Sequence, residues 1–178
     1  MPGPAEAVKL GGVDLSVKRM SGVAEVNDGV LVSRLVGGDD EIINGLRDSS
    51  VVAIDAPLSG IGKYRDVDRL MFKMGLRVMP ANWRWIIKLG ERATRIKDRL
   101  EELGVKVIET HPWSVLHWLN TDLIQLSSKL GVRKLVINGG KDAYDAAVCA
   151  LVALAYVMGK VKRITANDGE LYLISIEN

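Results

Sequence analysis

The chain has 178 residues, with 24 Lys or Arg, 22 Asp or Glu and a formal net charge of +2. This length predicts a single domain over residues 1–178, the lone Cys149 excludes an internal disulfide, and no apolar run is long enough to span a bilayer. The N-terminal residues lack the basic and apolar regions of a signal peptide, so we expect a cytoplasmic protein without a membrane partner.

The first third of the chain predicts three antiparallel strands and a helix. Residues 8–15 alternate in polarity like a strand, and the apolar runs 20–26 and 30–36 flank Asn27-Asp28-Gly29. Asp-Gly between two apolar runs is a strong hairpin signal. A short helix follows over residues 39–46, capped by an aspartate at its start.

In the middle of the chain, short buried strands flank a helical insert. Residues 51–54 and 105–108 are apolar throughout, which is typical of central parallel strands. The insert over about residues 60–104 holds two predicted helices, 65–74 and 82–103, the second with apolar residues every three or four positions. Further helical pieces are predicted over 113–119 and 122–130.

The last part predicts a helix over residues 141–158 and a hairpin made of 163–166 and 170–176. The helix is apolar on nearly all faces, so we expect it to be buried. Three meandering strands followed by strands that alternate with helices predict an α/β fold, with a mixed sheet flanked by helices.

Four acids occupy positions where a carboxylate is costly. Asp14 and Asp55 end apolar strands, and Asp142 and Asp145 open the apolar helix. A buried carboxylate needs a partner or takes up a proton, and oxygen ligands without Cys or His suit Mg²⁺ or Mn²⁺. Because ligands bind beyond the carboxyl ends of parallel strands, the four acids predict a metal site if they converge.

Each acid also has a simpler explanation. Asp14 can stabilise a turn, and acids in the first turn of a helix interact favourably with the helix dipole. The prediction of a metal site therefore depends on the convergence of all four acids.

Basic residues are concentrated in the helical insert. Residues 63–106 contain 12 basic and 6 acidic residues, whereas residues 1–62 contain 5 basic and 9 acidic ones. Like charges one helical turn apart disfavour a helix, so a basic stripe indicates a polyanionic partner such as nucleic acid, although a solvated helix face is an equal alternative. The stripe consists of Arg84, Lys88, Arg92, Arg95 and Arg99.

Several motifs then point to one family. They are Gly12-Val13-Asp14-Leu15, Ile54-Asp55-Ala56-Pro57, Arg65-x-x-Asp68, Glu109-Thr110-His111-Pro112 and Lys141-Asp142-Ala143-Tyr144-Asp145. Together they resemble the domain-of-unknown-function 429 family, predicted nucleases of the RNase H-like superfamily, over about residues 8–175. The resemblance implies an RNase H-like fold with Asp14, Asp55, Asp142 and Asp145 as catalytic ligands of two Mg²⁺ or Mn²⁺ ions. Two acids so close on the last helix resemble the resolvase branch, which implies two-metal hydrolysis of phosphodiester bonds in DNA or RNA.

The same motifs suggest supporting residues. Glu109 is a further ligand or a neighbour that orients one, and His111 and Lys141 are neighbours of the same kind. Two histidines and one cysteine argue against a zinc site. Arg65 and Asp68 lie one helical turn apart, so they either position a substrate or form a surface salt bridge.

Two other functions stay open. One is a non-catalytic nucleic-acid or protein-binding module that keeps the acids for structure. The other is an ATP-dependent phosphotransferase of the actin and sugar-kinase type, which needs a glycine-rich turn after its first strand. The corresponding turn here, Ser16-Val17-Lys18-Arg19, contains no glycine.

Overall fold

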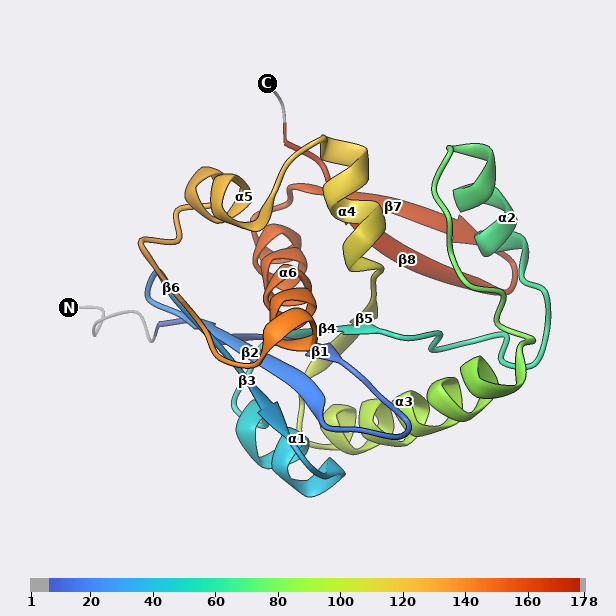
Figure 1. The fold of residues 1–178 in the computed structure, drawn as a ribbon, viewed down its shortest axis with the longest axis horizontal. Coiled ribbons are helices and arrows are strands. Elements are labelled where there is room, and N and C mark those ends of the chain that lie inside the picture. Colours follow the sequence, from blue (N-terminus) through green and yellow to red (C-terminus); the bar gives the residue numbers. More distant parts are fainter. Residues whose placement is uncertain (1–6, 177–178) are drawn as a thin grey trace.

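The computed structural model describes residues 7–176, which form a six-stranded mixed sheet, helices on both of its faces and a separate hairpin (Figure 1). The strand order is β5-β4-β1-β2-β3-β6. The first three strands form an antiparallel meander, and β4 and β5 extend the sheet in parallel beside β1. This arrangement confirms the predicted α/β class, with a mixed sheet flanked by helices. The strands are β1 (Leu10–Asp14), β2 (Ser21–Asn27), β3 (Val30–Val36), β4 (Val51–Asp55) and β5 (Lys106–Glu109).

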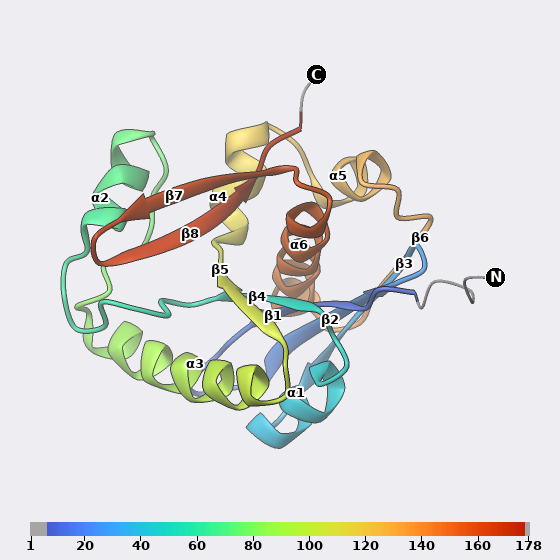
Figure 2. The same cartoon turned by 180° about the vertical axis from the view of Figure 1, so that it is seen from behind.

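Two features of the strands differ from the predictions. β6 (Lys134–Ile137) pairs in parallel with β3 and was missed, because only three apolar residues follow the basic pair Arg133 and Lys134. β7 (Val161–Ala166) and β8 (Gly169–Ile174) form the predicted hairpin, but they pair only with each other. The hairpin lies on the α6 side of the main sheet, where β8 contacts β5 and α6 (Figure 2).

The helices divide between the two faces of the sheet. On one face, α6 (Gly140–Val157) crosses the strands, and it packs with α2 (Asp66–Lys73), α4 (Pro112–Leu119), α5 (Leu123–Lys129) and the hairpin in one core. On the other face, α1 (Asp39–Leu46) and α3 (Arg84–Glu102) cover a second core (Figure 1). The insert over 60–104 therefore contributes α2 to one face and α3 to the other.

Two glycines let the backbone of α6 lie directly on the sheet. A Cβ atom at Gly12 on β1 would be 2.2 Å from the carbonyl oxygen of Ala146, and one at Gly22 on β2 would be 2.0 Å from that of Asp142. Contacts this close leave room only for the hydrogen atoms of glycine. Because Gly22 is the register partner of Asp14, the first turn of α6 is fixed above the carboxyl end of β1.

Candidate functional site

The carboxyl ends of two neighbouring strands bring a pair of acids together. Asp14 ends β1 and Asp55 ends β4, and the two residues are register partners across this parallel pair. Register partners on adjacent strands point their side chains to the same face of the sheet. Both residues are half-buried. The geometry predicted from the sequence for these two acids is therefore present.

The N-terminal turns of α6 bring the second pair of acids to the same place. Asp142 and Asp145 are one turn apart, and their side chains are only 19% and 17% exposed. All four acids line one cavity of about 250 Å³, together with Glu109 and other residues of the site. The cavity has apolar walls from α3 and the segment before it, formed by Val78, Met79, Trp85, Ile86 and Leu89.

Burial and mutual repulsion disfavour the charged state of the strand acids. Desolvation, followed by the charges of Asp55, Asp145 and Asp142, raises the pKa of Asp14 to about 9. Desolvation, followed by the charges of Asp145 and Glu109, raises the pKa of Asp55 to about 7. The positive groups around these acids therefore do not fully offset the negative charge that the acids would carry when ionised.

Two cationic side chains of the protein pair with the helix acids. Arg19, in the loop between β1 and β2, donates Nε–H and Nη2–H to the two carboxylate oxygens of Asp142, both at 2.9 Å. Lys141 donates to Asp145 Oδ2 at 2.5 Å along α6. With these pairs in place, no three Asp, Glu, His or Cys side chains within residues 7–176 are grouped to hold a metal ion. Arg19 occupies both oxygens of Asp142, so a metal ion at Asp142 has to displace Arg19, whereas Lys141 occupies only Oδ2 of Asp145.

The raised pKa values make the stability of the metal-free protein depend on pH. Between the ordinary carboxyl pKa and the raised ones, the folded protein holds protons that the unfolded chain releases. The contribution of Asp14 and Asp55 to the free energy of unfolding is thus complete below about pH 4 and is lost as the pH rises through about 7 and about 9. Urea unfolding in EDTA across this range should show the decline. Asp14→Asn should flatten it, whereas Asp48→Asn, at an exposed position, should not. An undiminished slope in Asp14→Asn would contradict the cluster.

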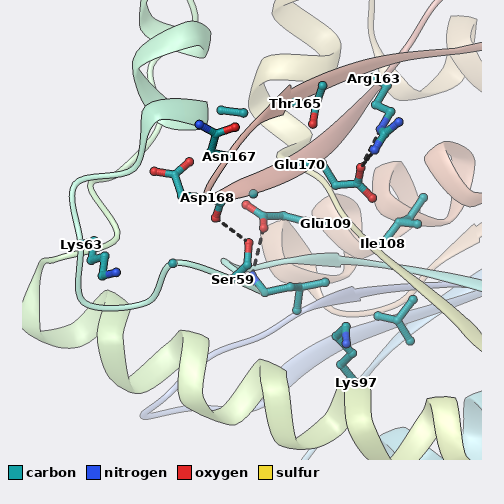
Figure 3. Close-up of a pocket in the computed structure, with 15 residues that line it drawn as sticks. Ser59, Lys63, Lys97, Ile108, Glu109, Arg163, Thr165, Asn167, Asp168 and Glu170 are labelled. Atoms are coloured by element: carbon teal, nitrogen blue, oxygen red, sulfur yellow. Dashed lines mark hydrogen bonds and ion pairs between the residues drawn. The ribbon is translucent and has the colours of Figure 1, made fainter.

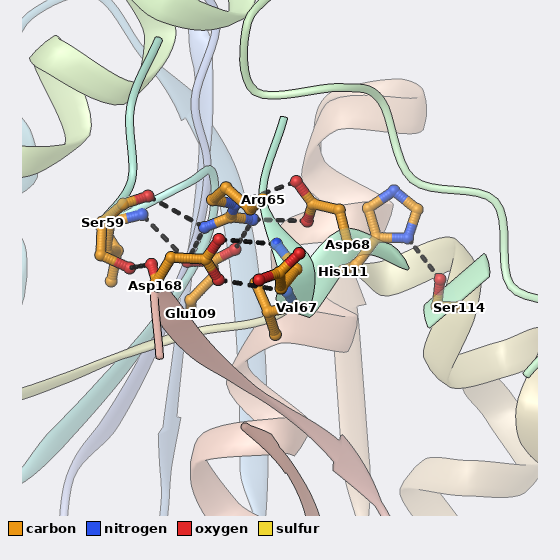
Figure 4. Close-up of polar contacts among 10 residues, drawn as sticks. Ser59, Arg65, Val67, Asp68, Glu109, His111, Ser114 and Asp168 are labelled. Carbon is orange, nitrogen blue, oxygen red and sulfur yellow. Dashed lines mark hydrogen bonds and ion pairs between the residues drawn. The ribbon is translucent and has the colours of Figure 1, made fainter. Parts of the chain in front are cut away.

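The structure corrects the interpretation of Arg65 and Asp68. Arg65 is 2% exposed, and its guanidinium lies between Asp68 and Glu109 (Figure 4). It donates to both oxygens of Asp68 at 2.9 and 2.7 Å, to both oxygens of Glu109 at 3.0 and 2.7 Å, and to the carbonyl oxygen of Ser59 at 3.1 Å. All five N–H donors are used, so this is a buried ion-pair network and not a surface salt bridge. Both residues line the acidic cavity, and their role in positioning a substrate stays a prediction.

The same network fixes Glu109. Besides Arg65, its Oε2 accepts the backbone N–H of Leu58 at 2.9 Å. Burial raises the pKa of Glu109, although the bonds from Arg65 and Leu58 oppose that rise. Glu109 is held at the wall of the cavity, beside the four acids, with both of its oxygens engaged.

His111 is held neutral at the other end of this wall. Its Nδ1 lies 2.6 Å from Ser114 Oγ on α4, and burial, followed by the charge of Lys141, lowers the pKa of His111 to about 4. Figure 4 shows the ring directed at Ser114. A neutral imidazole adds no charge to the acidic cavity. His117 is instead stacked on Trp113, with ring centroids 4.6 Å apart.

The basic stripe on α3 is only partly available to a partner. Arg92 donates to Asp39 Oδ1 at 2.7 Å and also contacts Ser16 and Ser21, while Arg99 donates to Asp40 Oδ1 at 2.8 Å. These two pairs hold α3 to α1, and the contact of both arginines with substrate stays a prediction. The exposed residues of the stripe without such a pair in the described chain are Arg84, Lys88 and Arg95.

Sequence reasoning missed two charged residues of this region. Arg19 lies in a loop with no helical or strand pattern, so nothing in the sequence connected it to Asp142. Asp168, in the turn between β7 and β8, accepts the backbone N–H groups of Asp66 and Val67 at 2.6 and 3.2 Å. Asp168 thus caps α2, whose own N-cap residue makes no side-chain cap hydrogen bond. The two partners are 101 and 102 positions apart in the chain, and no sequence pattern connects them.

A larger cleft opens on the other side of Glu109. It has a volume of about 730 Å³ and lies between the hairpin, Lys97 of α3 and the segment 58–63 (Figure 3). Its charges are largely paired within the protein, because Arg163 donates to Glu170 at 2.6 Å and Lys97 donates to Glu101 at 3.0 Å. The cleft thus lacks the unbalanced charge that marks the acidic cavity.

No helix within residues 7–176 has the length and apolar character needed to cross a bilayer.

No family model and no curated protein sequence matches the chain. Among solved structures, the chain is similar to T. thermophilus RuvC in complex with a Holliday junction substrate, with a TM-score of 0.47 and 14% identity. The match covers 92% of this chain and 99% of that chain. The interpretation of the site depends on the geometry described above.

Proposed function

We propose that this protein is a nuclease that hydrolyses phosphodiester bonds of DNA or RNA with Mg²⁺ or Mn²⁺. The observation that carries the proposal is the in-register pair Asp14 and Asp55 beneath the first turns of α6. Four carboxylates in one small cavity repel one another, and a divalent cation relieves that repulsion. Their oxygen-only donor set fits Mg²⁺ and Mn²⁺ and does not suit softer metals.

Each residue of the cavity has a role in this proposal. Asp14, Asp55, Asp142 and Asp145 hold two ions, which when bound supply activation of water and stabilisation of the leaving oxygen. Lys141 keeps the Asp145 carboxylate oriented along α6. Glu109 and its partner Arg65 form a rigid wall beside the strand acids.

The spacing of the helix acids supports a resolvase-like arrangement. Asp142 and Asp145 present two carboxylates from one helix, and this spacing, with the other motifs, also supports our proposal that the chain belongs to the domain-of-unknown-function 429 family. No observation favours an ATP-dependent phosphotransferase, since the loop after β1 contains no glycine.

Wild-type protein should cleave at least one member of a panel of labelled substrates in the presence of Mn²⁺ or Mg²⁺. The panel contains single-stranded and duplex DNA and RNA, together with branched DNA. EDTA should stop the reaction, and Ca²⁺ should support binding with little turnover, because its larger coordination shell positions water poorly. Tight binding without hydrolysis on every substrate would favour the non-catalytic binding module instead.

A further inference from the structure

Arg19 stands between two cavities. It lines the acidic cavity, where it holds Asp142, and it also lines a second cavity of about 510 Å³ between the β1–β2 loop and α3. In Figure 1 this loop lies beside α3. The charged residues that line the second cavity, here called the basic cleft, are Lys18, Arg19, Lys88, Glu91, Arg92 and Arg95. The two cavities therefore share Arg19 in their lining.

The basic cleft carries unbalanced positive charge. Five cationic side chains and one carboxylate line it, and of the cations Arg92 is paired with Asp39. Within residues 7–176, Lys18, Lys88 and Arg95 form no ion pair. Exposed cations that outnumber the acids beside them are suited to the phosphates of a nucleic-acid backbone.

The bond between Arg19 and Asp142 is suited to exchange. The Arg19 side chain is 70% exposed, so water can replace its hydrogen bonds when it leaves the Asp142 carboxylate, which is itself 19% exposed. Arg19 belongs to a loop, so it can change partner without moving a helix or strand. Lys141 differs, because it lies on the same helix as its partner Asp145 and does not line the basic cleft.

We propose that Arg19 is an exchangeable counterion that serves both cavities. Without a divalent ion it neutralises Asp142. When a divalent ion takes the Asp142 carboxylate, Arg19 is released to bind a backbone phosphate of the substrate strand at the entrance of the basic cleft, beside Lys18, Lys88 and Arg95. This inference rests on the proposed function, and it adds a phosphate-binding role for the β1–β2 loop.

Metal binding without nucleic acid provides the first test. Arg19→Ala removes the cation that competes with the metal, so the protein should bind Mn²⁺ about two- to fivefold more tightly in calorimetric titrations. Arg133→Ala is a matched control, because Arg133 is 71% exposed, comes from a loop and pairs with Asp28 far from both cavities. That variant should bind Mn²⁺ like wild type. Circular dichroism should show both variants folded.

Nucleic-acid binding provides the second test. In Ca²⁺, Arg19→Ala should weaken binding of a labelled oligonucleotide and reduce the slope of log K against log salt by about 0.7 for a single strand or 0.9 for a duplex. In EDTA, where Arg19 stays on Asp142, the same variant should change the slope much less. Arg19→Lys keeps the charge, so it should retain most of the wild-type slope in Ca²⁺.

The combination of tighter metal binding and a metal-dependent loss of slope supports partner exchange. Unchanged or weaker Mn²⁺ binding by Arg19→Ala, or equal slope changes in Ca²⁺ and EDTA, would overturn this inference and leave the proposed function standing. If wild-type protein takes up no divalent ion, the proposed function fails and the exchange fails with it.

Discussion

Asp55→Asn should abolish cleavage while leaving substrate binding near the wild-type level. The substitution removes one charge at the centre of the acidic cavity, where Asp55 faces Asp14 across the strand pair. Loss of a metal ligand removes several kcal/mol of transition-state stabilisation, which corresponds to roughly a 10³-fold or greater loss in rate. Binding depends on phosphate contacts made by Lys and Arg, so it does not share this loss. Single-turnover cleavage in Mn²⁺ and oligonucleotide binding in Ca²⁺ measure the two effects separately.

The amide is nearly isosteric with the carboxylate, and it relieves repulsion, so misfolding is not an expected cause of the loss. Asp145→Asn should behave in the same way, because Asp145 is the charge that most strongly raises the pKa of Asp55 after burial. Asp48→Asn, an exposed change outside the cavity, is the matched control and should cleave normally. Residual cleavage within about tenfold of wild type in Asp55→Asn would remove this residue from the proposed metal ligands.

Arg65→Met should destabilise the protein strongly. Arg65 is the shared partner of two buried carboxylates, and its removal leaves Asp68 and Glu109 without compensation. Breaking a buried pair by removing one partner costs about 3–5 kcal/mol, which for a chain of this size lowers Tm by roughly 6–20 °C. Thermal and urea unfolding measure the loss directly.

The same helix provides the control for this prediction. Arg69→Met breaks an ion pair with Asp66 that has the same i, i+3 spacing but is exposed, so its effect on Tm should be small. Adding Asp68→Asn and Glu109→Gln to Arg65→Met should recover part of the stability, because the amides carry no charge to desolvate. If Arg65→Met and Arg69→Met lower Tm equally, the buried network does not hold the fold as described.

The sequence identified the parts of the fold that follow from local pattern. Alternating polarity, the Asp-Gly turn and the apolar run of α6 each indicate their element without knowledge of distant contacts. The pairing of Asp14 with Asp55 was also predictable, since the carboxyl ends of neighbouring parallel strands meet at one edge. β6 was missed because three apolar residues are too few to show a period.

The partners of charged residues were not predictable in the same way. Arg92 and Arg99 formed a plausible stripe on a helix, but Asp39 and Asp40 lie more than 50 positions earlier in the chain. Likewise, the spacing of Arg65 and Asp68 indicates an i, i+3 pair but gives no sign of Glu109, 44 positions away. Whether such a pair is buried depends on the whole fold, so spacing alone misassigns the role of each charge.

The glycine contacts of α6 have a consequence for how this chain tolerates change. At Gly12 and Gly22 backbone meets backbone, so the height of the helix above the strands is independent of any side-chain volume. Apolar residues further along α6 can vary in size and be compensated by their neighbours without shifting Asp142 or Asp145. The two glycine positions have no such freedom, because even a methyl group lifts the helix and separates its acids from those of the strands. A homologous chain that keeps the four acids at this separation should therefore keep glycine at both positions. Its apolar core residues along α6 are free to change in size.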